Sequence, residues 1–264
     1  MARLFIFGLG YSAKRIKHSL ECIGWTVSAT GRDGEVSFDD DAAVREALGR
    51  STHVLSSVPP AVQSDPVLAR YGDVLGHDWL GYLSSSGVYG DTGGAWVDEN
   101  APTGSGRRNA RAQCEAHWLA RDARVLRLPG IYGPGRSAFE RLREGKAHRI
   151  DSPGQVFSRI HVDDLAAGVI AALAAPPGAY NLADELPASQ NAVIEEACRL
   201  LGMAPPPLQS LDKAGLSPQA RAFYSENRRV ANGKARRVLG WQPRFADYRA
   251  GLRDCLRRSS PGAR

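Results

Sequence analysis

Cysteine pairs, long apolar runs and internal repeats are all missing from this chain of 264 residues. The four cysteines, Cys22, Cys114, Cys198 and Cys255, are widely spaced, and no Cys-x-x-Cys pair occurs. This spacing argues against a metal site or a redox dithiol, so we expect reduced thiols that serve as packing residues. No apolar run approaches the length of a membrane span, and glycines break the apolar N-terminal stretch too early for a signal peptide. We therefore expect a cytoplasmic protein with no membrane partner and no metal.

A recognisable nucleic-acid-binding module is also missing, although the formal net charge is +6. The arginines are spread along the chain rather than gathered in one stretch, so we expect no nucleic-acid partner. The charge has two interpretations: arginine usage on solvated faces, or a basic cleft for a phosphorylated ligand. The hydrophobic content of 43% and the charged content of 23% are typical of a globular protein with a substantial core.

The stretch from Leu4 to Ala13 joins an apolar run to two glycines and then to a helical pattern. Gly8 is expected to make a tight turn after a first strand, and Gly10 to let the backbone approach a pyrophosphate closely. The N–H groups and the dipole of the following helix would hold this anion. The residues expected to contact the dinucleotide here are Gly8, Gly10, Tyr11, Ser12 and Ala13.

The second strand, expected over 25–30, ends in Thr30-Gly31-Arg32. The residue at this place reads the adenosine ribose: an acid binds the 2′-hydroxyl of NAD, and an arginine pairs with the 2′-phosphate of NADP. Arg32 favours NADP, because a guanidinium matches phosphate geometry. Asp33 follows directly, so NAD remains an alternative cofactor. The alternative to a phosphate-binding role is that Arg32 is a surface arginine in a turn.

Strands and helices alternate through the first half of the chain. The patterns predict strands over 53–58, 79–84 and 124–128, and helices over 40–48, 66–75 and 110–119. This alternation requires a parallel sheet with right-handed crossovers, and hence the α/β class. The second half predicts strands over 157–161 and 179–182, helices over 137–144, 162–174 and 189–201, and a helical, arginine-rich tail from 217. Residues 92–100 lack periodicity and are expected to form a loop near a substrate cleft.

Further segments then carry a resemblance to a known family: Ser85–Gly90, Leu126–Arg136, Arg159–Ala166 and Val238–Pro243. With the glycine turn, and in this order, they make the chain resemble the extended and atypical short-chain dehydrogenases/reductases, with the NAD-dependent epimerase/dehydratase group closest. The resemblance implies a Rossmann-type doubly wound parallel sheet with a smaller, mostly C-terminal substrate-binding part. It implies an NAD(P)-binding core over 1–130, completed by about 155–182, and a smaller part over 131–154 and 183–264, interleaved with the core.

The family's usual chemistry needs a serine or threonine and a Tyr-x-x-x-Lys pair on the following helix. The resemblance puts Ser85 at the hydroxyl position, Arg107 at the tyrosine position and Arg111 at the lysine position. Arg111 could still bind ribose hydroxyls, but Arg107 cannot transfer protons near neutral pH, because a guanidinium stays protonated there. The resemblance also puts Pro129 beside the nicotinamide ring.

Other titratable groups are candidates to replace the missing tyrosine. Tyr89 and Tyr132 follow strand ends at the edge where such sheets bind ligands, and His161 is a natural proton carrier near neutral pH. Each of them has a packing role as its alternative. Asp163 and Asp164 are expected to cap the helix that follows.

These observations favour an NAD(P)-binding oxidoreductase or epimerase/dehydratase-like protein, with NADP preferred over NAD. Its small-molecule substrate would be a carbonyl or alcohol, for which a sugar is one option. The alternative is a catalytically inactive NADP-binding sensor or scaffold, which Arg107 and Arg111 favour. Family members often dimerise through the two helices expected here over 66–75 and 110–119, so a homodimer is a further option.

Overall fold

A six-stranded parallel sheet forms the centre of the computed structural model, which describes residues 2–62 and 64–259. The order across the sheet is β10-β6-β4-β3-β1-β2, and every neighbouring pair is parallel. The strands are β1 (Arg3–Phe7), β2 (Thr26–Ala29), β3 (His53–Ser56), β4 (Trp79–Ser85), β6 (Arg124–Leu128) and β10 (Gly178–Asn181). The predicted α/β class and the doubly wound parallel sheet are confirmed.

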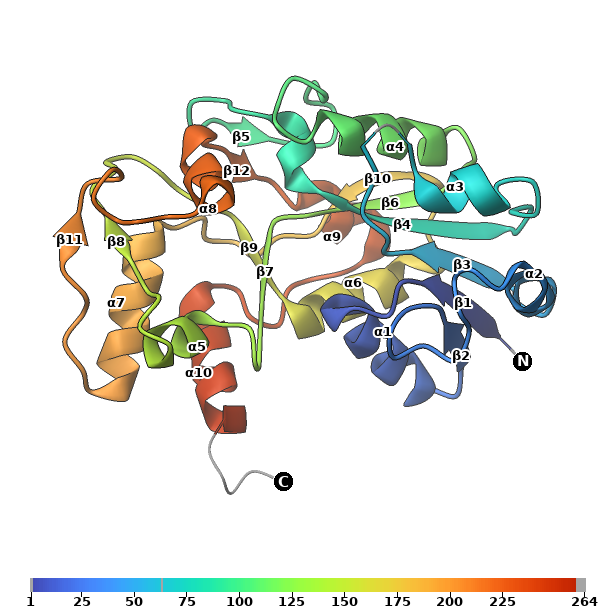
Figure 1. Ribbon diagram of the computed structural model, residues 1–264, viewed down its shortest axis with the longest axis horizontal. Coiled ribbons are helices and arrows are strands. Elements are labelled where there is room, and N and C mark those ends of the chain that lie inside the picture. The colour runs from blue at the N-terminus through green and yellow to red at the C-terminus, as the bar shows by residue number, and fades with distance from the viewer. Residues whose placement is uncertain (1, 63, 260–264) are drawn as a thin grey trace.

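Helices cover both faces of this sheet (Figure 1), and β1 shows why. Its side chains alternate, so Leu4 and Ile6 join one core cluster while Phe5 and Phe7 join another. The first cluster includes residues of α1 (Tyr11–Glu21) and α6 (Val162–Ala172). The second includes residues of α2 (Asp41–Gly49), α3 (Pro66–Tyr71) and α4 (Asn109–Leu119). A strand buried on both faces reads as a continuous apolar run, as this stretch does.

The chain changes from one face of the sheet to the other at β1. Strands β2 and β3 lie on either side of β1, and the helices that lead to them, α1 and α2, pack on opposite faces of the sheet. In an open parallel sheet, ligands bind outside the carboxyl ends of the strands at such a switch point. The glycine turn follows β1 at this edge, and Ser57 follows β3. The topology therefore puts a crevice where the turn is expected to bind a dinucleotide.

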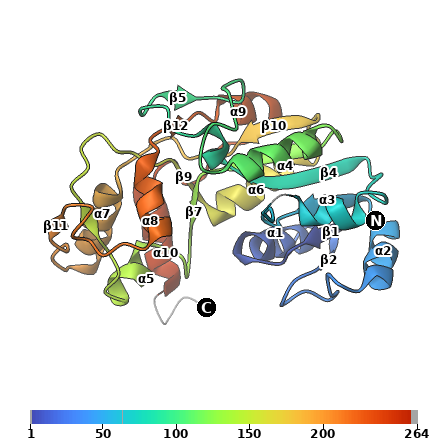
Figure 2. The ribbon, with the colours of Figure 1, turned by 45° about the horizontal axis from the view of Figure 1, so that its top comes forward.

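A smaller part lies beside the sheet, where Figures 1 and 2 both place α5 (Ala138–Arg143), α7 (Gln190–Leu201) and α10 (Tyr248–Ser259) together. These helices share a core that includes Phe139, Val193 and Leu252. Two short parallel pairs accompany them: β7 (Gly130–Tyr132) with β9 (Arg159–His161), and β8 (Arg149–Ile150) with β11 (Leu208–Gln209). The chain enters this part after β7 and returns to the core for α6 and β10. The division into two interleaved parts at the residues given above remains our interpretation.

The prediction of a helical tail from 217 is wrong in part. The tail contains the short helix α8 (Pro218–Ala222), the 3₁₀ turn η2 (Phe223–Ser225), the strand β12 (Arg229–Val230) and the helix α9 (Gly233–Leu239) before α10. Strand β12 pairs with β5 (Trp96–Val97), inside the segment expected to be a plain loop. A two-residue strand shows no periodicity in the sequence, and its partner lies far along the chain, so neither strand could be read locally.

Two simpler expectations concern the thiols and the membrane. Cys114, Cys198 and Cys255 are buried as predicted, whereas Cys22 is exposed. Within the ranges 2–62 and 64–259, none of the helices combines the length and the apolar character needed to cross a bilayer.

Candidate functional site

A cavity of about 880 Å³ opens between the carboxyl edge of the sheet and the smaller part. Its walls come from the N-terminus of α1, from the ends of β3, β4 and β6, from α5 and α7, and from the segment 216–230. The predicted site residues that line it are Gly10, Tyr11, Ser12, Ala13, Ser85, Arg111, Pro129 and Tyr132. Three predicted residues do not line it: Gly8, Arg32 and His161.

The glycine turn has one crowded and one open position. Gly8 has a φ of +88°, and a Cβ there would lie 3.0 Å from Ser57 Oγ, so this turn requires glycine. Its N–H donates to Thr30 Oγ1 at 3.0 Å, which holds the turn against the end of β2. At Gly10, by contrast, no described atom lies within 4 Å of where a Cβ would be. This empty cradle faces the cavity.

The N-terminus of α1 borders that cradle. Gly10 is its N-cap, so no side chain caps the helix, and no acidic residue stands in its first turn. The first N–H groups of a helix have no partner within it, and they carry the positive end of the helix dipole. The cradle and the free donors together suit an anionic group such as a pyrophosphate.

Arg32 lies exposed in the turn after β2, beside the glycine turn but outside the cavity lining. A Cβ at Gly31 would come within 2.8 Å of the Leu9 nitrogen, so the two turns are in direct backbone contact. Asp33, the residue that kept NAD open, pairs with Lys14, and this contact lowers the pKa of its carboxyl. Arg32 has no carboxylate partner within the described ranges.

Ser85 ends β4 and is half-buried in the cavity wall. Its Oγ accepts a hydrogen bond from the Gly87 N–H at 3.1 Å and so caps the 3₁₀ turn η1 (Ser86–Tyr89). The hydroxyl proton is still available to donate to a ligand oxygen.

A buried polar network lies behind this serine. Ser84 Oγ donates to Glu115 at 2.7 Å, and the same carboxylate forms a salt bridge with Arg127. Arg127 Nη1 donates to the Tyr89 hydroxyl at 2.8 Å, and this hydroxyl donates to Asn181 Oδ1 at 2.7 Å. Tyr89 is therefore fully engaged and does not line the cavity. It anchors the ends of β4, β6 and β10 to one another and is not placed to meet a ligand.

The arginines at the tyrosine and lysine positions have different surroundings. Arg111 donates through Nη1 to the Tyr82 hydroxyl and to the Leu83 carbonyl, both at 3.1 Å, and borders the cavity. Arg107 donates its backbone N–H and its Nε to Glu226, at 2.9 and 3.1 Å. The Arg107 guanidinium also lies 4.4 Å from the centre of the Phe223 ring. The tyrosine position is thus used to hold the segment 216–230 over the cavity.

Tyr132 contributes its ring to the cavity wall, but its hydroxyl is buried and has no partner among the described residues. The hydroxyl lies against Gly251 of α10, where a Cβ would not fit. Burial raises the pKa of Tyr132 far above its usual value. Nearby Asp184 is also buried, and its environment raises the pKa of its carboxyl to about 8.

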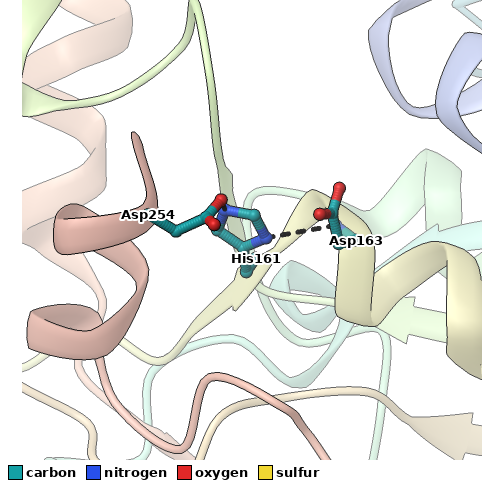
Figure 3. Close-up of side chains that lie close together, drawn as sticks. All are labelled: His161, Asp163 and Asp254. Carbon is teal, nitrogen blue, oxygen red and sulfur yellow. Dashed lines mark hydrogen bonds and ion pairs between the residues drawn. The ribbon is translucent and has the colours of Figure 1, made fainter. Parts of the chain in front are cut away.

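His161 lies between Asp163 and Asp254, as Figure 3 shows, and is completely buried away from the cavity. Its Nδ1 accepts a hydrogen bond from the Asp163 N–H at 3.2 Å, so His161 is the N-cap of α6. Burial lowers the pKa of His161 to about 4. The expectation that Asp163 and Asp164 cap this helix is wrong; Asp164 instead accepts the N–H groups of Arg244 and Phe245.

The side chains in Figure 3 lie close enough to one another to hold a metal ion, but arginines already neutralise both carboxylates. Asp163 pairs with Arg15 of α1 and with Arg258 of α10. Asp254 also pairs with Arg258, at 2.9 Å. The cluster therefore ties α10 to α1 and α6, since guanidinium groups supply the positive charge that a metal would bring.

Sequence reasoning missed the far wall of the cavity. This wall includes Ala220, Phe223, Tyr224, Glu226 and Arg228, all from the stretch expected to be a helical tail. Residues 92–100, expected near the cleft, do not line it; Thr92 and Gly94 instead donate to the Asn227 carbonyl. The only local signal for the far wall was the density of arginines in the tail.

Comparisons with known proteins extend this description, although no family model matches the chain. A functionally unknown conserved protein from Silicibacter pomeroyi DSS is 40% identical, with 97% of this chain and 98% of that chain covered and a TM-score of 0.87. The human epimerase family protein SDR39U1 (isoform 2), solved with NADPH, is 18% identical over 96% of this chain and 98% of its own, with a TM-score of 0.76. A 3-diazoavenalumate denitrifying reductase from Streptomyces sp is 32% identical over 140 residues, which are 48% of this chain and 45% of that protein.

Proposed function

Because the chain belongs to the same family as the conserved Silicibacter pomeroyi protein and has the fold of the extended and atypical short-chain dehydrogenases/reductases, we propose that it binds NADP and acts as an oxidoreductase or epimerase-like enzyme. The observation that carries this proposal is the open cradle at Gly10, at the uncapped N-terminus of α1. A backbone that presents free N–H groups to an empty space fits a pyrophosphate. The NADPH in the human protein of the same fold supports it.

NADP is preferred over NAD because of the turn after β2. Arg32 is exposed and forms no salt bridge with a carboxylate within the ranges described, while Asp33 is engaged by Lys14. A guanidinium that is free to form a bidentate contact is suited to a 2′-phosphate. An engaged carboxylate is poorly suited to accept hydrogen bonds from a ribose.

The remaining roles follow from positions along the cavity. Arg111 borders the cavity and would bind ribose hydroxyls, and Pro129 would lie beside the nicotinamide. The bound nicotinamide supplies or accepts a hydride at a carbonyl or alcohol carbon. Ser85 would donate a hydrogen bond to the oxygen on that carbon and so orient the substrate.

A cofactor-binding sensor or scaffold is the second candidate, and one observation favours it. Arg107 occupies the tyrosine position and is fixed to Glu226, so it cannot exchange protons with a ligand. Neither Tyr132 nor His161 presents a titratable atom to the cavity in its place, since the Tyr132 hydroxyl lies against α10 and His161 is outside the lining.

The cofactor assignment is tested by calorimetric titration of the wild type and of the Arg32→Ala variant with NADPH and with NADH, which measures the affinity for each cofactor. We expect Arg32→Ala to weaken NADPH binding roughly 10- to 100-fold and to leave NADH unchanged, since a charge-assisted contact is lost. Arg50→Ala is a matched control, because Arg50 is an exposed arginine at the C-cap of α2. Equal affinity of the wild type for NADH and NADPH would contradict the proposal that Arg32 binds the 2′-phosphate.

Turnover is tested separately by mixing the NADPH complex with a panel of carbonyl compounds and following the loss of NADPH absorbance. Oxidation of NADPH that disappears in Ser85→Ala supports the enzyme. NADPH binding with no turnover across the panel favours the sensor.

A further inference from the structure

The cavity holds an excess of positive charge. Its lining includes seven arginines, which are Arg107, Arg108, Arg111, Arg136, Arg141, Arg159 and Arg228, but only two acidic residues, Glu140 and Glu226. Both glutamates are already occupied: Glu226 by Arg107 and Arg228, and Glu140 by the N-cap Ser137 and by Arg143. A concave site with this balance attracts anions.

Four of the seven arginines have guanidinium groups that hydrogen bonds or ion pairs hold in place. Arg107 and Arg228 share the Glu226 carboxylate. Arg111 donates to the Leu83 carbonyl and to a tyrosine hydroxyl, and Arg159 donates to the carbonyls of Phe157 and Ala188. These four have a structural reason to be where they are.

The guanidinium groups of Arg108, Arg136 and Arg141 have no hydrogen bond and no ion pair with any residue in 2–62 or 64–259, but Arg136 and Arg141 are exposed. Arg108 differs from them in its burial. It is half-buried, and its aliphatic stem fills the space over Gly87, where a Cβ would lie only 2.6 Å from Arg108 Cγ. Burial, together with the neighbouring charges of Arg107 and Arg111, lowers the pKa of Arg108. The nearby carboxylate of Glu226 raises this pKa in part, but it is already paired with Arg107 and Arg228. A partly desolvated cation with so little counter-charge is costly, so an anionic ligand at this place would be stabilised strongly.

The place of Arg108 separates it from the cofactor phosphates. It is the N-cap of α4, and its stem lies on the Gly87 whose N–H bonds Ser85 Oγ, at the end of β4. The pyrophosphate cradle follows β1, which is two strands away from β4 in the sheet, or roughly 10 Å. No acidic residue stands in the first turn of α4, so the dipole of this helix adds to the attraction.

We propose that Arg108 binds a carboxylate or phosphate group of the substrate, close to the atom that Ser85 contacts. This inference rests on the proposed function, and it narrows the substrate to anionic carbonyl or alcohol compounds. The planar guanidinium can contact either group through two parallel hydrogen bonds. The anionic group then fixes which carbon of the substrate faces Ser85 and the nicotinamide.

The test is calorimetric titration of the full-length protein, with and without saturating NADPH, using malonate and inorganic phosphate as probes. We expect at least one probe to bind the wild type, and Arg108→Gln to weaken it roughly 10- to 100-fold. Arg108→Lys should bind the probes more tightly than Arg108→Gln but less tightly than the wild type. Lysine keeps the positive charge but cannot form the two parallel hydrogen bonds of a guanidinium. The tighter of the two probes identifies the class of the anionic group.

Arg141→Gln is the matched control, since Arg141 is an exposed arginine of α5 that lines the same cavity. Unfolding temperatures of the variants show whether they remain folded. The proposal is overturned if neither probe binds the wild type, if Arg108→Gln binds both probes as the wild type does, or if Arg141→Gln weakens them equally. It is also overturned if NADPH displaces the probes, because they would then occupy the cofactor's phosphate site. Failure of NADPH to bind in its own titration contradicts the proposed function instead.

Discussion

The carboxylate of Glu226 receives both the backbone N–H and the side-chain Nε of Arg107. These residues are more than a hundred positions apart, and their contact joins the start of α4 to the segment that forms the far wall of the cavity. Arg107, which we expect at the position of the family's proton-transferring tyrosine, holds the far wall of the cavity in place. The shape of the cavity therefore depends on an ion pair at the place where chemistry was expected.

Replacing Glu226 by Gln should loosen this wall. The change leaves Arg107 and Arg228 without their shared counter-charge, so we expect a loss of about 1–3 kcal/mol in the free energy of unfolding. Amide hydrogens of residues 217–226 should exchange faster, as measured by mass spectrometry, while those of α2 stay unchanged. Glu46→Gln, in an exposed pair with Arg50, is the control and should cost less than about 0.5 kcal/mol. Unchanged exchange in 217–226 would show that apolar packing alone holds the wall.

Substitution of the two glycines of the turn by alanine should affect different properties: the stability at Gly8 and the cofactor affinity at Gly10. Gly8→Ala places a side chain at positive φ against Ser57, so we expect the free energy of unfolding to fall by about 1–3 kcal/mol. Gly10→Ala meets open space at an ordinary φ, so stability should hold while the methyl group obstructs the pyrophosphate. We expect NADPH binding to weaken roughly 10-fold or more in Gly10→Ala. Wild-type affinity in this variant would argue against the cradle.

His161 should make the protein less stable in mild acid. Its folded pKa of about 4 is below the usual 6.5, so the unfolded chain takes up a proton that the folded chain refuses. The contribution of His161 to the free energy of unfolding is fully present above pH 6.5. It is lost as the pH falls toward 4, by about 3 kcal/mol in total. His161→Asn keeps a cap acceptor without this titration, so urea unfolding between pH 7 and 4 should show a shallower loss. The exposed His117→Asn is the control; an unchanged slope in His161→Asn would rule out this source of the acid sensitivity.

Asp184 should act in the opposite direction. Its folded pKa of about 8 is above the usual 3.8, so the folded protein keeps a proton that the unfolded chain releases. Stability therefore decreases as the pH rises from 3.8 to 8. Asp184→Asn removes the cost, and we expect it to be about 1–3 kcal/mol more stable than the wild type at pH 7, with the difference vanishing near pH 4. A less stable variant at pH 7 would mean that Asp184 is ionised and paired electrostatically with Arg159.

The features that the sequence predicted correctly are local ones. The continuous apolar run of β1, the glycine turn and the helical spacing of α1 all occur within about two dozen consecutive positions, so each leaves a local pattern in the sequence. The sheet followed from the repetition of such units.

The features that could not be predicted depend on contacts between distant residues. Glu226 has no feature of its own that points to Arg107, and the two-residue strands β5 and β12 exist only because they pair with each other. His161 looked like a proton carrier because its type is titratable. Its complete burial comes from packing against distant parts of the chain, among them Asp254 and Cys255 of α10, which no local pattern describes.

The late position of β10 in the chain has a consequence for how the protein is made. During synthesis, β6 emerges long before β10, because the first segment of the smaller part and α6 lie between them. Until β10 arrives, β6 has an open edge. Until α6 arrives, the face of the sheet that α6 and α1 cover together is only partly covered. A nascent chain that ends before α6 should therefore depend on a chaperone, and the two parts should fold as one cooperative unit rather than in succession.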